Sequence, residues 1–202
     1  MSIDFLAIDP NVLTIQQTAT SKVHEKIMLN LEGSGNTLVL GNKARLGAIR
    51  LDVIGNNNKI IIEDSVSYKR GHLRVVGDNQ TFRIGKGTTI EKCYFLCAEN
   101  CDITVGENCM FSYEIVIRTT DAHSVLDLAT RERINKAESI HIGNHVWLGA
   151  EVMITKGVSL PDDCIVGARS ICNRSVEESH TVIAGTPAKI VKRGVTWDRE
   201  RI

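Results

Sequence analysis

Apolar residues recur at every sixth position through the C-terminal half of the chain. When residues are counted in sixes from Ile142, the first position is aliphatic or cysteine and the fifth is small or branched. The first positions are Ile142, Leu148, Ile154, Leu160, Val166 and Cys172. An amphipathic helix would show apolar residues at i, i+3, i+4 and i+7, and a lone strand would alternate them. A period of six over 142–177 instead predicts short strands separated by turns, with two inward side chains in each unit.

The N-terminal half repeats with a longer period, set by the equal spacing of Gly33, Gly55 and Gly77. A polar column at the same spacing comprises Asn36, Asn58 and Gln80, with Cys101 one shorter step later. The apolar columns are predicted to be Leu38–Ile60–Phe82–Ile103, Leu40–Ile62–Ile84–Val105, Leu29–Leu51–Leu73–Tyr94 and Leu31–Val53–Val75–Leu96. Like residues would thus stack on like residues, as in a solenoid whose turns bury their apolar edges only against neighbouring turns.

One stretch interrupts the period. Val105, Phe111 and Ile117 begin hexads, but the next hexad in phase begins at Ile142. About 19 residues more than three hexads need lie in between, so residues 120–139 are predicted to leave the coil as a loop, where function often resides. We therefore expect three parts: an N-terminal segment 1–28 without assigned structure, a β-helix domain 29–182 that carries the loop, and a C-terminal tail 183–202.

Composition narrows the possible functions. The 24 Lys and Arg residues balance 24 Asp and Glu residues, which argues against nucleic-acid or membrane-surface binding through a basic face. Phe, Trp and Tyr make up 4% of the chain, so we expect a core of Ile and Val with little room for rings. No apolar run approaches the ~20 residues of a membrane span. Met1-Ser-Ile-Asp-Phe5 does not resemble a signal peptide and the six cysteines are expected to be reduced, so a cytoplasmic location is predicted.

The hexads of 142–177 resemble those of the hexapeptide-repeat acyltransferases, and Ile183-Ala-Gly-Thr-Pro-Ala-Lys189 looks like the terminal motif of that superfamily. Thr120-Asp-Ala-His-Ser124, followed by Ile142-Gly-Asn-His-Val-Trp-Leu-Gly-Ala150, is similar to bacterial capsule and polysaccharide O-acetyltransferases, including polysialic acid O-acetyltransferases. The resemblance implies an all-β, left-handed parallel β-helix that forms a homotrimer with active sites between subunits. It also implies transfer of acetyl from acetyl-CoA to a saccharide hydroxyl, with no metal.

The resemblance assigns catalytic roles to three residues. His123 would be the general base, because a neutral imidazole with a pKa near ~6.5 can take the hydroxyl proton and later protonate the thiolate. Asp121 would orient that imidazole, as a carboxylate does in other histidine-based sites. Trp147, at an outward hexad position, would bind the donor or the oxyanion. Ser124 as an acyl-enzyme nucleophile is a further option, but we favour direct transfer.

The resemblance also implies a donor site. Ala150 and Ala168 are separated by three hexads, so they would stack in successive coils and let the pantetheine arm approach the backbone. Asn173 and Arg174 occupy the place of a polar–basic pair, and Lys189 and Lys192 could meet the CoA phosphates as point charges.

Alternatives remain at this stage. The first is N-acylation of an amino sugar or nucleotide sugar. An amine acceptor needs less help from a general base, so the role of His123 would be smaller. His141 and His145 together with His123 suggest a γ-class carbonic anhydrase, although ligands on one rung are poorly placed to converge on zinc. A non-catalytic β-helix scaffold is the third alternative. Five basic residues are predicted at outward positions, where they would either face an anionic glycan or serve as ordinary surface charge. They are Arg50, Lys69, Arg70, Arg74 and Arg83.

Overall fold

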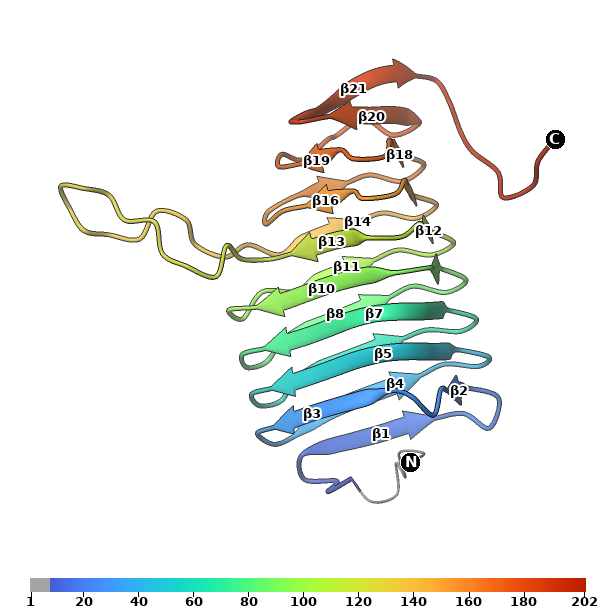
Figure 1. Cartoon of the computed structure of the whole chain (residues 1–202), viewed down its shortest axis with the longest axis vertical. Coiled ribbons are helices and arrows are strands. Elements are labelled where there is room, and N and C mark those ends of the chain that lie inside the picture. The colour runs from blue at the N-terminus through green and yellow to red at the C-terminus, as the bar shows by residue number, and fades with distance from the viewer. Residues whose placement is uncertain (1–7) are drawn as a thin grey trace.

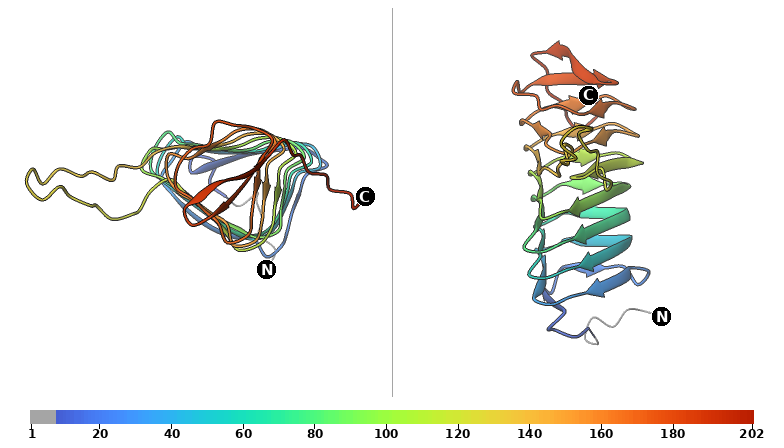
Figure 2. Two further views of the ribbon diagram at one scale, coloured as in Figure 1. Left: turned by 90° about the horizontal axis from the view of Figure 1, so that it is seen from above. Right: turned by 90° about the vertical axis from the view of Figure 1, so that its left-hand side faces the viewer.

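The structure is a computed structural model that describes residues 8–202, and every regular element in this range is a β-strand. Short parallel strands form the stacked coils of a β-helix, which climbs from the N-terminal to the C-terminal end in a left-handed sense (Figure 1). Along its axis the coil is triangular, with three flat faces (Figure 2). The predicted all-β, left-handed parallel β-helix is thus confirmed. No element of residues 8–202 is a helix long and apolar enough to cross a bilayer.

Face 1 is a seven-stranded parallel sheet. Its strands are β1 (Leu13–Gln17), β4 (Asn36–Leu40), β6 (Lys59–Ile62), β8 (Thr81–Ile84), β11 (Ile103–Val105), β14 (Ile140–Ile142) and β17 (Ser159–Leu160). Faces 2 and 3 merge into one sheet, because two long strands run through the corner between these faces. These are β5 (Arg45–Ile54) and β7 (Ser67–Val76).

The remaining strands complete the other two faces. Face 2 holds β2 (Lys22–Val23), β9 (Thr89–Ile90), β12 (Met110–Phe111), β15 (Trp147–Leu148), β18 (Ile165–Val166) and β20 (Thr181–Gly185). Face 3 holds β3 (Met28–Glu32), β10 (Cys93–Ala98), β13 (Ile115–Arg118), β16 (Met153–Ile154) and β19 (Ile171–Cys172). β21 (Ala188–Arg193) pairs antiparallel with β20 at the C-terminal end.

The coils begin earlier than the sequence spacing indicates. β1 starts at Leu13 and pairs with β4, so part of the segment 1–28, which the sequence left unassigned, contributes a strand of face 1. Residues 1–7 of that segment lie outside the described residues. At the other end, part of the tail 183–202 forms the hairpin of β20 and β21.

The predicted polar column of Asn36, Asn58 and Gln80 is present in the structure, and its side chains bond from coil to coil. The Oδ1 atom of Asn36 accepts from the backbone N–H of Asn58 at 3.0 Å, and Oδ1 of Asn58 accepts from the N–H of Gln80 at 2.9 Å. Gly55 belongs to the glycine column beside it and has φ +124°. A Cβ at Gly55 would lie 2.0 Å from the carbonyl oxygen of Gly77, so the stacked backbones leave no room for a side chain there.

One coil lies out of register with the prediction. β10 pairs with β7 so that Leu73 faces Phe95 and Val75 faces Cys97. The inward residues of this coil are therefore Phe95 and Cys97, and the predicted inward positions of Tyr94 and Leu96 were wrong. The shorter step of the repeat occurs only after β10, where Phe82 pairs with Ile103. A change of one residue in a strand moves each side chain to the other face.

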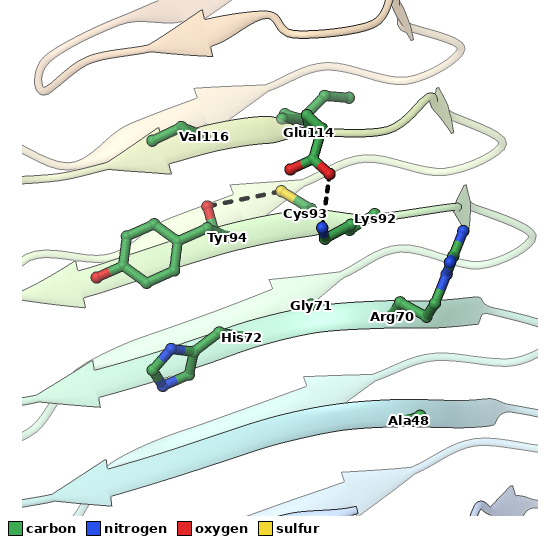
Figure 3. Close-up of a pocket in the computed structure, with 10 residues that line it drawn as sticks. Ala48, Arg70, Gly71, His72, Lys92, Cys93, Tyr94, Glu114 and Val116 are labelled. Carbon is green, nitrogen blue, oxygen red and sulfur yellow. Dashed lines mark hydrogen bonds and ion pairs between the residues drawn. The ribbon is translucent and has the colours of Figure 1, made fainter.

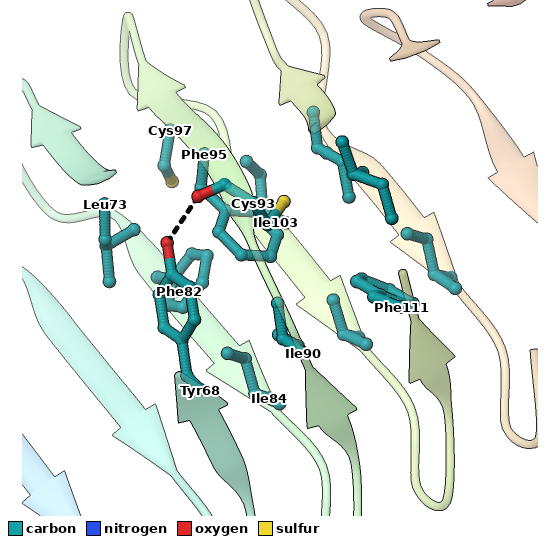
Figure 4. Close-up of a cluster of buried hydrophobic side chains, with 14 of the residues drawn as sticks. Tyr68, Leu73, Phe82, Ile84, Ile90, Cys93, Phe95, Cys97, Ile103 and Phe111 are labelled. Atoms are coloured by element: carbon teal, nitrogen blue, oxygen red, sulfur yellow. Dashed lines mark hydrogen bonds between the residues drawn. The ribbon is translucent and has the colours of Figure 1, made fainter. Parts of the chain in front are cut away.

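The interior also accepts aromatic rings, contrary to expectation (Figure 4). Tyr68, Phe82 and Phe95 are fully buried, and their rings meet edge to face with centroids 5.8 and 5.0 Å apart. The hydroxyl of Tyr68 donates to the carbonyl oxygen of Cys93 at 2.7 Å, so its polar end is satisfied. A ring is also buried on a two-residue strand, because Phe111 of β12 is 1% exposed.

The cysteines are free thiols, and five of the six are buried. Burial raises the pKa of Cys97 to about 12 and the pKa values of Cys109 and Cys172 to about 11. Such thiols stay protonated and unreactive, which fits side chains that fill the coil interior.

The register of β10 can be checked by mutation. We expect Phe95→Ala to lower the free energy of unfolding by about 3–5 kcal/mol, because it opens a cavity within the aromatic cluster. Tyr94→Ala, on the outward side of the same strand, should cost less than half as much. Denaturant unfolding of both variants measures the difference. An equal or larger loss for Tyr94→Ala would contradict the register.

Candidate active site

A long arm leaves the coil between β13 and β14 and projects far from the stack (Figures 1 and 2). Its two sides are joined by backbone hydrogen bonds, from Asp127 to Glu132 at 2.9 Å and from Ile134 to Val125 at 2.9 Å. The arm is thus a narrow two-sided ribbon, and the predicted site residues Asp121 and His123 lie near its base.

Glu99, which follows β10 in the coil below, anchors the base of the arm. Its carboxylate accepts two hydrogen bonds from the Arg133 guanidinium, at 2.6 and 3.1 Å, and one from the Thr120 hydroxyl. Arg118 donates to the carbonyl oxygen of Thr120 at 2.6 Å. The hydrogen bonds from Arg133 and Thr120 hold the pKa of Glu99 below its usual value.

Asp121 forms a second anchor. Its carboxylate accepts from Lys156 Nζ at 2.7 Å and from Asn135 Nδ2 at 3.0 Å, and these hydrogen bonds lower its pKa. Asn135 Nδ2 also donates to the carbonyl oxygen of His123 at 2.8 Å. Asp121 therefore connects to His123 through Asn135 and the backbone. Among the hydrogen bonds within residues 8–202, none joins the Asp121 carboxylate to the His123 imidazole, which is exposed.

Trp147 lies on the opposite side of the coil. Its strand β15 pairs with β12 and β18, which lie at the edge opposite to the arm in Figure 1. The indole points outward and is 37% exposed. One chain therefore does not bring His123 and Trp147 together.

The C-terminal tail supports Trp147 through Trp197, a residue that the sequence reasoning did not consider. Trp197 is 7% exposed and stacks on His145, with ring centroids 4.3 Å apart and planes 10° apart. Its Nε1 donates to the carbonyl oxygen of His145 at 2.8 Å, and its ring centroid lies 6.1 Å from that of Trp147. Arg199 fixes the end of the tail by donating to the carbonyl oxygen of Cys109 at 2.8 Å. The signal available in the sequence was that Trp197 is the second of two tryptophans.

The predicted donor residues lie in different places on the chain. Ala150 and Ala168 occupy successive coils at the corner between faces 2 and 3, where the N–H of Arg169 donates to the carbonyl oxygen of Ala150 at 2.8 Å. Asn173 and Arg174 follow β19, at the edge of the coil that also bears the arm. The exposed Lys189 and Lys192 lie on β21. A single chain thus brings together only the two alanines.

The two histidines considered as zinc ligands have other partners. His141 Nδ1 lies 2.8 Å from the Thr104 hydroxyl, and His145 Nδ1 pairs with the Asp163 carboxylate at 2.7 Å. Over residues 8–202 no group of three or more His, Cys, Asp or Glu side chains is arranged to hold a metal ion.

Sequence and structure comparisons both relate the chain to the same group of acetyltransferases. No family model matches the chain. The chain is 34% identical over 194 residues to the polysialic acid O-acetyltransferase of Neisseria meningitidis, covering 86% of this chain and 90% of that protein. The crystal structure of the polysialic acid O-acetyltransferase OatWY matches 94% of this chain and 89% of its own, with TM-score 0.86 and 32% identity. That of the polySia-specific acetyltransferase NeuO matches 94% and 90%, with TM-score 0.70 and 28% identity.

Hexad coils interrupted by an arm, in a left-handed β-helix, define the chain as a hexapeptide-repeat acetyltransferase. With its match over most of both sequences, the chain belongs to the polysialic acid O-acetyltransferase family. The predicted resemblance and the prediction of an acyltransferase are thereby confirmed.

The arm should loosen in acid. The pKa values of Glu99 and Asp121 are lowered in the folded chain, so their stabilising effect is complete above the usual carboxyl pKa of about 4 and is lost as pH falls through the lowered values. Amide hydrogen exchange, corrected for its intrinsic pH dependence, should show that protection near Thr120 falls as the pH is lowered from 7 to below the usual carboxyl pKa of about 4. Glu99→Gln should weaken this protection already at pH 7. Equal protection at both pH values would contradict the anchoring role.

Proposed function

We propose that this chain transfers an acetyl group from acetyl-CoA to a hydroxyl of a saccharide, namely a capsular or other surface polysaccharide or its precursor. The observation that carries the proposal is the match over nearly the whole chain to enzymes named polysialic acid O-acetyltransferases. Incubating the protein with acetyl-CoA and a panel of capsular glycans tests it. Release of CoA that depends on one of the glycans is the expected result.

In the proposed reaction His123 acts as general base. It removes the proton of the acceptor hydroxyl while that oxygen attacks the thioester carbonyl carbon. The resulting oxyanion collapses as the C–S bond breaks, and the imidazolium returns its proton to the CoA thiolate. Trp147 would donate its indole N–H to the oxyanion or pack against the pantetheine arm. Asp121 would act through Asn135, which holds the backbone carbonyl of His123.

The proposal requires more than one copy of the chain, because His123 and Trp147 lie on opposite edges of the coil. Exposed apolar side chains on the arm support a homotrimer, since a neighbouring subunit would cover them. Leu128 is 89% exposed and Ile134 64% exposed. Two outward residues of face 3, Met153 and Ile171, offer a second apolar contact surface.

Such a trimer would also unite the proposed donor site. The corner with Ala150 and Ala168 on one subunit would face the edge with Asn173 and Arg174 on the next. The small alanines suit the pantetheine arm, and Arg174, with Lys189 and Lys192, suits the phosphates of CoA. Acetyl-CoA is a metabolite of the cell interior and the cysteines are free thiols, which supports the predicted cytoplasmic location.

Replacing the base should abolish most activity. We expect His123→Ala to reduce kcat/KM by about 10²–10⁴-fold in the transfer assay, the usual value of general base catalysis. His141→Ala, an exposed histidine on face 1, is the matched control and should retain activity. If His123→Ala keeps more than about a tenth of the wild-type kcat/KM, the assignment of the base is wrong.

Mixing two inactive variants tests the shared site. His123→Ala and Trp147→Ala are each expected to be inactive. In co-refolded mixed trimers, however, some sites combine the intact His123 of a Trp147→Ala subunit with the intact Trp147 of a neighbouring His123→Ala subunit. Random mixing of equal amounts should restore about a quarter of the wild-type sites. Absence of any restored activity, with mixed trimers present by mass spectrometry, would show that the site is not shared.

A further inference from the structure

We propose that the cleft lined by β7, β10 and the start of β13 is an acceptor subsite that binds a carboxylate-bearing sugar unit of a polymeric glycan. The cleft lies at the corner between faces 2 and 3 and has a volume of about 420 Å³. Figure 3 shows its lining residues. This inference rests on the proposed function for its biological role, and it names the chemistry of the acceptor and the surface that binds it.

The floor of the cleft is bare. Gly71 has φ +139°, and a Cβ there would lie 1.9 Å from the carbonyl oxygen of Cys93. Any other residue would clash, so the backbone itself forms the base of the cleft between the side chains around it. Ala48, in the coil below, adds only a methyl group. A sugar ring can therefore lie close to the sheet.

The walls differ in chemistry. On one side, His72 and Tyr94 meet edge to face, with ring centroids 5.5 Å apart (Figure 3). On the other side lie Arg70 and the Lys92–Glu114 ion pair, whose Nζ and Oε1 atoms are 2.5 Å apart. Within residues 8–202 the exposed Arg70 has no ion-pair partner, so its guanidinium is available to a carboxylate in bidentate geometry.

The buried carboxylate of Asp52 holds the basic side chains of face 3 in place beside the cleft. Asp52 points outward from face 3, yet its side chain is only 3% exposed. It contacts Arg50 at 2.7 Å, His72 at 2.9 Å and Arg74 at 3.3 Å. Burial alone would raise the pKa of Asp52, but hydrogen bonds from Arg50 and His72 outweigh burial and lower it, so the carboxylate remains ionised. One negative charge thus holds two arginines and a histidine in place at the surface next to the cleft.

The position of the cleft favours a polymer. Arg70 on β7 lies three coils below Trp147 on β15, or about 14 Å at the usual spacing of parallel strands. A single sugar at the transfer site does not span that distance, whereas a glycan chain does. The corner that holds the cleft leads to Ala150 at one end. At the other end it continues into a wider cleft of about 740 Å³, where Lys22 and Arg45 add two cations.

The phosphates of CoA are anions like the carboxylates of a glycan, and either could bind to Arg70. The experiment must therefore distinguish binding of the glycan from binding of CoA. Binding of polysialic acid to the whole protein is measured by calorimetry, without donor and again with saturating CoA. The same polymer with its carboxyl groups reduced to alcohols is the ligand control. We expect binding of the carboxylated polymer only, undiminished by CoA.

Variants locate the subsite. The double variant Arg70→Gln with Tyr94→Ala should raise both the Kd and the KM for the polymer about tenfold, with kcat and the KM for acetyl-CoA unchanged. Lys59→Gln removes the same charge from face 1 and should change neither. A thermal melt and the oligomeric mass confirm that each variant is folded and assembled.

The outcomes separate the two proposals. If polymer binding is the same in the double variant and the wild type, the subsite is wrong and the transfer function stands. If the double variant raises the KM for acetyl-CoA instead, the cleft binds CoA phosphates and the subsite is again wrong. If the double variant loses polymer binding but no acetyl transfer occurs in any protein, the subsite stands and the proposed function fails.

Discussion

The stacking of each coil on the next is the constraint on which the structure depends. A solenoid buries its apolar residues only between neighbouring turns, so every inward position must match the position one coil away. The glycine column shows how tight this matching is, because a Cβ at Gly55 would lie 2.0 Å from the backbone of the next coil. The same stacking fixes the outward residues in columns. Outward residues of neighbouring coils therefore form strips along the axis.

The repeat made most of the fold predictable from sequence, since the hexads and the column of Asn36, Asn58 and Gln80 follow directly from spacing. The failure at β10 has a physical cause. The repeat shortens by a single position within one coil, and spacing alone does not show on which side of the strand that position is lost. The error moved Phe95 out of the core, and with it the aromatic cluster that Phe95 forms with Tyr68 and Phe82.

The candidate site was less accessible to sequence reasoning, because it is divided among distant edges of one chain. The interruption of the hexads located the arm, and with it His123. The role of Asn135 was not predictable, since it depends on how the arm folds back on itself. Trp197 was missed for a similar reason: its contact with His145 joins residues 52 positions apart through a tail without any repeat. Long-range contacts of irregular segments leave no period to read.

The pairing of Trp147 with Trp197 has one more consequence. These two residues are all the tryptophan in the chain, and their ring centroids lie 6.1 Å apart beside the proposed donor site. Tryptophan fluorescence therefore comes entirely from this one region of the 202-residue protein. The enzyme carries its own optical probe, placed where occupancy by a ligand or a neighbouring subunit would change its surroundings.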